Sequence, residues 1–275
     1  MITKAIIPVA GWGTRRLPIT KTIEKCMLPI GNRPIIDYNV QDCIKAGITE
    51  FIFVVGEQSN QLQEYYRSNI PLNDYLRRQG KENMLDLVAP LQDIKFHFVV
   101  QPSYGKYGTA VPVALASEFI EPGESVVVVM GDDFFYNVDG SSETKRLIED
   151  TPQGENSILA AVLPEDDSLT GRYGLIEADE SGYLIRVNEH PDYVPDRFIK
   201  NVAKYVLNYD MLMSVKRYVS EGEPNSSGEY YIFTPFEEMF KAGARMKVVH
   251  AQGQFLDGGT VEGWLHANNV VVGGA

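Results

Sequence analysis

Carboxylates stand directly after one of the most apolar segments of this chain. Asp132 and Asp133 follow the run Val126–Met130, with Gly131 between. A carboxylate at the end of a buried strand suits a hard cation that prefers oxygen ligands, such as Mg²⁺. Paired aspartates beside a glycine also occur in ordinary turns. The pair by itself therefore leaves a metal site and a plain turn both open.

A glycine-containing loop follows the first apolar run, Lys4–Val9. Residues 11–16 read Gly-Trp-Gly-Thr-Arg-Arg. Glycines let backbone N–H groups approach a ligand closely, and turns of this kind bind anions such as phosphate. A tight turn without a ligand would have the same composition. The loop is not a Walker A loop, because no Gly-Lys-Ser/Thr follows, and Arg16 stands where a dinucleotide-binding loop has its third glycine.

The elements that must position these residues alternate between strand and helix patterns over the first 165 residues. Strands are predicted at Lys4–Val9, Phe51–Val55, Ile94–Val100, Val126–Met130 and Ile158–Val162, and helices at 34–46, 58–88 (with breaks near Asn69–Pro71 and Gly80), 108–119 and 142–150. Fully apolar strands separated by helices indicate a parallel sheet covered on both faces. Ligands bind such sheets beyond the carboxyl ends of the strands, where the loop and the aspartates fall.

The second half of the chain predicts antiparallel additions to this sheet. A hairpin is expected from Tyr173–Ile176 and Tyr183–Val187 around Asp179–Gly182, further strands at Val202–Leu207 and Met246–Val249, and helices at 210–220 and 235–242. We therefore expect an α/β fold, with a Rossmann-like mixed, mainly parallel sheet, helices on both faces and antiparallel additions in the second half. Residues 1–275 are expected to form a single domain.

The segment from Gly11 to Pro29 carries a longer motif. It reads G-W-G-T-R-R-L-P-I-T-K-T-I-E-K-C-M-L-P. This resembles the signature of the nucleoside triphosphate:sugar-1-phosphate nucleotidyltransferases, roughly G-x-G-T-R-x-x-P-x-T-K-x-x-P-K-E-M-L-P. The resemblance implies an enzyme that joins a nucleoside triphosphate to a sugar 1-phosphate with Mg²⁺ as cofactor and expels pyrophosphate. Catalysis of such a transfer is mostly positioning and charge neutralisation.

The resemblance also assigns roles in the nucleotide-binding half, residues 1–165. Arg15 can grip phosphate oxygens in a bidentate fork, and Lys25 can place a compact charge near the α-phosphate. Asp132 is the implied first Mg²⁺ ligand, and these three residues are the candidate catalytic set. Gln101 occupies the place of a glutamine that reads the pyrimidine edge. The other candidate nucleotide-binding residues are Ala10, Gly11, Gly13, Thr14, Gly108 and Thr109.

The half at 166–275 is expected to bind the sugar and to supply the second metal ligand. Phe-Leu-Asp-Gly-Gly-Thr at 255–260 resembles the family's W-x-D-x-G-T/S, which makes Asp257 that ligand. Gly174 occupies the place of a glycine that meets the hexose. Glu189 and His190 stand at the family's E-K-P, where the glutamate binds sugar hydroxyls and the lysine contacts the sugar's phosphate. Lys200, ten residues on, is the candidate to compensate for His190.

Two features favour a uridylyltransferase, with UTP and glucose 1-phosphate as the expected pair. The glycine loop is short, and 61–90 form a helical insertion that resembles the insertion of bacterial uridylyltransferases. Besides His190, two residues depart from the signature: Cys26 replaces its glutamate and Glu24 the proline before Lys25. A thymidylyl- or cytidylyltransferase acting on another sugar remains an alternative, as does a non-catalytic regulatory subunit that binds sugar nucleotides.

Bulk composition excludes several other classes. The net charge is −12, which argues against nucleic acid or anionic membranes as partners. No run of 18 apolar residues and no signal peptide is apparent, and two cysteines make neither a disulfide framework nor a zinc site. A nicotinamide oxidoreductase is also disfavoured, because it would need a third glycine in the loop and an acidic ribose ligand about 20 residues further on, where the lysine-containing motif stands. We expect a cytoplasmic protein, and the family resemblance adds a homo-oligomer.

Overall fold

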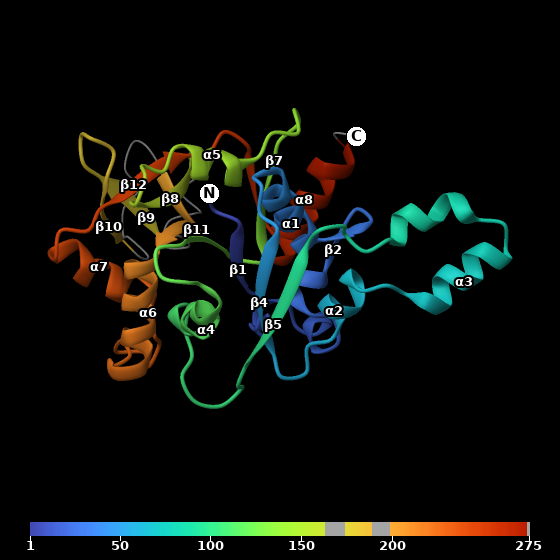
Figure 1. Cartoon of the computed structure of the whole chain (residues 1–275), viewed down its shortest axis with the longest axis horizontal. Coiled ribbons are helices and arrows are strands. Elements are labelled where there is room, and N and C mark those ends of the chain that lie inside the picture. The colour runs from blue at the N-terminus through green and yellow to red at the C-terminus, as the bar shows by residue number, and fades with distance from the viewer. Residues whose placement is uncertain (163–173, 189–198, 274–275) are drawn as a thin grey trace.

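A nine-stranded mixed sheet runs through the centre of the molecule (Figure 1). The computed structural model describes residues 1–162, 174–188 and 199–273. Four parallel strands lie in the spatial order β6, β1, β4, β5; they are β1 (Lys4–Pro8), β4 (Glu50–Gly56), β5 (Lys95–Gln101) and β6 (Ser125–Val129). Residues 51–55 of β4 are all buried, as a strand covered on both faces requires.

The second half of the chain extends this sheet beyond β6. The added strands are β8 (Asn156–Val162), β9 (Leu175–Ala178), β10 (Leu184–Asn188), β11 (Ile199–Asn208) and β12 (Met246–His250). β11 is antiparallel to β6, β8 and β9, β9 and β10 form the predicted hairpin, and β12 is parallel to β8. The register of β11 against β8 breaks around Ala203, which has a φ of 49°. The predicted mixed sheet with antiparallel additions is confirmed.

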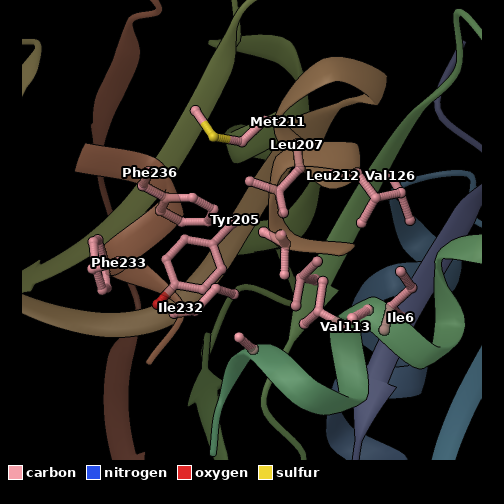
Figure 2. Packing of buried hydrophobic residues seen from close by; sticks show 14 of the residues in the cluster. Ile6, Val113, Val126, Tyr205, Leu207, Met211, Leu212, Ile232, Phe233 and Phe236 are labelled. Atoms are coloured by element: carbon pink, nitrogen blue, oxygen red, sulfur yellow. The ribbon is translucent and has the colours of Figure 1, made fainter. Parts of the chain in front are cut away.

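Two hydrophobic cores lie on opposite faces of the sheet because successive strand residues point to opposite sides. On one face, Ile6 packs with α4 (Ala110–Ala116), α6 (Tyr209–Glu221) and α7 (Phe233–Lys241). Figure 2 shows Tyr205 of β11 against Phe233 and Phe236 in this core, with ring centroids 5.9 and 5.8 Å away. On the other face, Ala5 and Ile7 pack with the helices α1 (Ile35–Lys45), α2 (Gln61–Tyr66) and α5 (Glu143–Glu149).

The later part of the predicted helical insertion, 61–90, projects from the body of the molecule as an arm (Figure 1). The arm consists of α3 (Ile70–Arg78) and a 3₁₀ helix at Glu82–Val88, whereas α2, the first part of the predicted insertion, packs against the sheet. Asn69 caps α3, since its side chain accepts a hydrogen bond from the Leu72 amide. The break predicted at residues 69–71 separates α2 from α3, although α3 already begins at Ile70, and the break predicted near Gly80 separates α3 from the 3₁₀ helix.

Two small two-stranded sheets and the helix at 261–273 were not predicted. β7 (Asp133–Tyr136) pairs antiparallel with β13 (Gln254–Asp257), and β2 (Pro29–Ile30) pairs with β3 (Arg33–Pro34). α8 (Val261–Gly273) packs with these strands in a third core. The β7–β13 register sets Asp257 opposite Asp133, so residues 124 positions apart in the sequence become neighbours.

Both cysteines are free and buried, Cys26 and Cys43. Burial raises the pKa of the Cys43 thiol to about 12 and that of Cys26 further still. Neither thiol is therefore poised to act as a nucleophile. Across the described residues, no helix combines the length and the apolar character that crossing a membrane needs.

A buried ion pair joins α1 to β11. Lys204 Nζ lies 2.9 Å from Asp42 Oδ2, and the two side chains are 4% and 14% exposed. The Asp42 carboxylate also accepts hydrogen bonds from the backbone amides of Glu143 and Thr144, at the start of α5. Burial by itself would raise the pKa of Asp42, but the Lys204 charge and the hydrogen bonds that the carboxylate accepts hold this pKa below its ordinary value.

Replacing Lys204 should therefore destabilise the fold. Lys204→Met leaves a buried carboxylate without its cation, and we expect the free energy of unfolding to fall by about 3 kcal/mol. The matched control is Lys216→Met, which removes an exposed ion pair with Glu118 and should cost less than about 0.5 kcal/mol. Urea denaturation measures both, and equal effects would contradict the assignment.

The sign of the pH dependence follows from the lowered pKa of Asp42. The pair stabilises the fold above the ordinary pKa of 3.8 and loses this effect as the pH falls through the lower folded value. The difference in the free energy of unfolding between wild type and Lys204→Met should accordingly become smaller as the solution is acidified.

Candidate active site

A cavity of about 740 Å³ opens beyond the carboxyl ends of the parallel strands β1, β4, β5 and β6. Most of the residues that the sequence singled out for nucleotide binding and catalysis line it: Ala10, Gly11, Gly13, Lys25, Gln101, Gly108, Thr109 and Asp132. The residues that follow β4, 57–61, also line the cavity and were not predicted as site residues. This is the position at which open α/β sheets bind ligands.

The glycine loop packs directly against the segment that carries Lys25. Gly13 has a φ of 63°, and a Cβ there would lie 3.0 Å from Thr20 Cγ2 and 3.1 Å from Lys25 Cβ. The Thr20 hydroxyl donates a hydrogen bond of 2.9 Å to the Gly13 carbonyl. A glycine is needed here both for the left-handed backbone conformation and for the close approach.

The two arginines of the loop take different positions. Thr14 and Arg15 are exposed in a short 3₁₀ helix and are not among the residues that line the cavity. Arg16 is buried, with its guanidinium 5.2 Å from the Trp264 ring centroid, and it donates to the carbonyls of Gly258 and Thr260. Arg16 thus ties the glycine loop to the segment after Asp257. Sequence reasoning missed this role, because adjacent arginines give no sign of which one turns inward.

Lys25 lies beside two of the candidate carboxylates. Its ammonium forms an ion pair with Asp132 Oδ2. A Cβ on Gly259 would lie 2.9 Å from Asp257 Oδ1 and 3.5 Å from Lys25 Nζ, which places this ammonium near the Asp257 carboxylate too. Backbone contacts fix the arrangement, since the Gly258 amide donates to the Asp132 carbonyl at 3.1 Å and the Gly259 amide to Asp257 Oδ1 at 2.6 Å.

Asp133 and Lys200 complete the charged cluster. Burial and the charges of Asp132 and Asp257 raise the pKa of Asp133 well above its ordinary value, although Lys200 acts in the opposite sense. Lys200 is 4% exposed, with its ammonium 3.8 Å from the Phe255 ring centroid. Burial lowers the pKa of Lys200 to about 8, against the pull of the three carboxylates.

The donor set fits a magnesium ion that shares its coordination with a substrate. Within residues 1–162, 174–188 and 199–273, no three His, Cys, Asp or Glu side chains form a complete metal site. Mg²⁺ typically takes one or two carboxylates and fills its remaining positions with water and phosphate oxygens. Asp132 and Asp257 offer two such carboxylates at one place. Asp133 Oδ1 beside them is buried without a hydrogen-bond donor from the described chain.

Gly108 and Thr109, which line the cavity, pack against the segment around Tyr230. Gly108 has a φ of 126°, and a Cβ there would lie 2.4 Å from the Tyr230 carbonyl oxygen. The Ala110 amide donates to that carbonyl at 2.9 Å, and the Thr109 hydroxyl accepts from the Ile232 amide at 3.0 Å. Glu229 also lines the cavity and was not predicted as a site residue.

Of the sugar-binding candidates, Gly174 and Lys200 are among the described residues. Gly174 is buried, and its carbonyl accepts a hydrogen bond of 2.9 Å from the Asn201 amide, next to Lys200. The predictions for Glu189 and His190 fall outside the described residues. Lys200 therefore connects this half of the chain to the carboxylates of the other half.

The sequence is similar to those of known proteins. Residues 4–272 match the family model for nucleotidyl transferases. The chain is 29% identical to the UTP–glucose-1-phosphate uridylyltransferase of Pseudomonas aeruginosa over 276 residues, which cover 98% of this chain and 95% of the relative. It is 37% identical to that of Streptococcus pyogenes over 178 residues, covering 64% of this chain and 57% of the relative.

Solved structures agree with the sequence comparison. A crystal structure of UDP-glucose pyrophosphorylase complexed with UDP-glucose aligns over 100% of both chains, with a TM-score of 0.79 and 25% identity. An apo structure of UDP-glucose pyrophosphorylase gives a TM-score of 0.84 over 99% of both chains, also at 25% identity. The family match spans the glycine loop, Lys25 and the aspartates on β7 and β13, and the chain belongs to the nucleotidyl transferase family.

Proposed function

We propose that this chain transfers the uridylyl group of UTP to glucose 1-phosphate, giving UDP-glucose and pyrophosphate. The observation that carries this proposal is the convergence of Lys25, Asp132 and Asp257 beside a cavity large enough for a nucleotide. The uridylyltransferase relatives, one of them aligned over nearly its whole length, support this choice of substrates.

In the proposed reaction, an oxygen of the sugar phosphate attacks the α-phosphorus of UTP in line. A new P–O bond forms, and the bond to the β-phosphate oxygen breaks as pyrophosphate leaves with its electron pair. The Lys25 ammonium stabilises the negative charge that develops on the α-phosphate oxygens. Asp132 and Asp257 would hold Mg²⁺, which when bound supplies positive charge to the phosphate oxygens. Arg15, on the exposed helix of the glycine loop, stays a proposed phosphate ligand.

The two halves of the chain would divide the recognition between them. Backbone amides of the glycine loop bind the triphosphate, and Gln101, Gly108 and Thr109 surround the base. We propose that the half at 166–275 binds glucose 1-phosphate, with Lys200 near its phosphate. The buried free thiols suit the cytoplasm as the place of work, and assembly as a homo-oligomer remains part of the proposal.

A substrate panel tests the proposed reaction. We expect pyrophosphate release with UTP and glucose 1-phosphate, and slower release when dTTP, CTP or another sugar 1-phosphate replaces either substrate. A preference for another pair would correct the substrates. Binding of UDP-glucose without turnover of any pair would indicate a regulatory subunit instead.

A variant of Lys25 tests the role of its charge. Lys25→Ala should lower the rate by about 10² to 10³-fold, because it removes a fixed charge from the transferred phosphate. The control Lys81→Ala, on the exposed arm, should leave the rate unchanged.

Magnesium dependence tests the carboxylate pair. EDTA should abolish turnover and added Mg²⁺ should restore it. Asp257→Asn should raise the Mg²⁺ concentration for half-maximal rate by roughly tenfold or more, since one of two anionic ligands is lost. The control, Asp139→Asn, lies in an exposed turn and should behave as wild type. An unchanged Mg²⁺ requirement in Asp257→Asn would remove this residue from the metal site.

The close contact between Gly108 and the Tyr230 backbone gives a test of the proposed nucleotide-binding part of the cavity. Gly108→Ala must push the Tyr230 backbone away, and we expect the KM for UTP to rise about tenfold. Gly105→Ala is the matched control, because Gly105 also has a positive φ, 106°, but nothing lies within 4 Å of a Cβ there. Both variants share the backbone strain, so only Gly108→Ala should affect the KM. Equal increases of the KM in both variants would mean that backbone strain, and not the contact with Tyr230, is responsible.

A further inference from the structure

Glu24 makes an unusual set of contacts for a residue beside a catalytic lysine. Its carboxylate accepts hydrogen bonds from the Ser59 hydroxyl at 2.6 Å, the Asn60 amide at 2.9 Å and the Gln61 amide at 2.8 Å. The Gln61 side chain returns the contact: its Oε1 accepts from the Glu24 amide at 3.0 Å, and its Nε2 donates to the Thr22 carbonyl at 2.8 Å. We call these five hydrogen bonds the Glu24 clamp.

The clamp joins two segments that both line the cavity. One is residues 20–26, which carry Lys25, and the other is residues 57–61, which follow β4 and begin α2. The Asn60 side chain does not cap α2, so the amides of Asn60 and of Gln61, the first residue of α2, depend on Glu24 from 36 and 37 positions away. Hydrogen bonds to an ionised carboxylate are stronger than neutral ones, which makes this a firm connection.

Lys25 is therefore held on both sides. Glu24 before it is bound to the start of α2, and Cys26 after it is 4% exposed and packs in the core beneath the sheet. The amides of Met27 and Leu28 donate to the carbonyls of Glu24 and Lys25, at 2.8 and 3.3 Å, which closes the turn around the lysine. The backbone of Lys25 has little freedom left, while its side chain reaches Asp132.

The clamp stands where the family signature has a proline. Proline restricts a chain by fixing φ near −65°, and Glu24 has a φ of −57°. Glu24 thus adopts a backbone conformation that proline would impose, but here contacts with another segment hold it. We propose that Glu24 is a positioning residue for Lys25, which uses the start of α2 to fix the catalytic loop. This inference rests on the proposed function, since it concerns the placement of its catalytic lysine.

Three variants of Glu24 test the proposal. Glu24→Ala removes the carboxylate, and we expect kcat to fall about tenfold or more, because a small displacement of a catalytic group is costly, while the KM values change by less than about threefold. Glu24→Pro fixes φ but also removes the amide that donates to Gln61, so it should regain part of the lost kcat through the fixed φ alone. Glu24→Gln, which keeps this amide, should lose less kcat than Glu24→Ala. Glu64→Ala, an exposed carboxylate on α2, is the control and should match wild type.

Hydrogen exchange measured by mass spectrometry supplies a second readout that does not need turnover. In folded Glu24→Ala, the amides of Met27 and Leu28 should exchange about tenfold faster than in wild type, and those of the central strands should not change. A folded Glu24→Ala with wild-type kcat would overturn the proposal, as would a lower kcat with unchanged exchange at Met27 and Leu28. If wild type makes no UDP-glucose, the proposed function fails, and exchange at these two amides decides the clamp alone.

Discussion

Mutual repulsion of carboxylates is the constraint on which this site depends. The β7–β13 pairing sets Asp133 opposite Asp257, and Asp132 precedes Asp133 in the chain. Carboxylates at such distances destabilise one another in a partly buried place unless cations or protons compensate. The fold brings two lysines to them: Lys25 from the loop after β1, and Lys200 from β11. The raised pKa of Asp133 adds a third compensation, since it favours the neutral carboxyl.

This balance explains why segments from four parts of the chain must meet. The loop after β1 brings Lys25, the turn after β6 and the start of β7 bring two aspartates, β11 brings Lys200, and β13 brings the last aspartate. Arg16 binds carbonyls just beyond Asp257, and the amides of Gly258 and Gly259 contact Asp132 and Asp257. The Arg16 contacts join the N-terminal loop to the C-terminal segment, the Gly258 amide joins that segment to Asp132, and the Gly259 amide fixes the Asp257 carboxylate within it. The charged cluster thus depends on contacts between segments that are far apart in the sequence, and no single local motif forms it.

The sequence predicted the repeating part of the fold well, because buried parallel strands and amphipathic helices leave strong periodic patterns. β7 and β13 escaped, since four-residue strands carry too little pattern, and their pairing depends on a contact between distant segments. The same limit applied to the site. Fixed motifs pointed to Lys25, Asp132 and Asp257, which the fold brings together. Arg16, Glu24 and Glu229 make contacts that only the folded chain provides. The sequence marked Arg16 and Glu24 only as departures from known motifs, and it gave neither their partners nor a site role for Glu229.

The net charge of the chain is a poor guide to this site, even though both proposed substrates are anions. Charges more than about 8 Å apart across water are largely screened at physiological ionic strength, so the surface excess behind the −12 adds little at the cavity. Locally, three carboxylates and two ammoniums give a formal charge of −1, or zero when Asp133 is neutral. A divalent cation would then make the cluster positive. The site can hold two phosphorylated substrates because its own carboxylates are already neutralised from within.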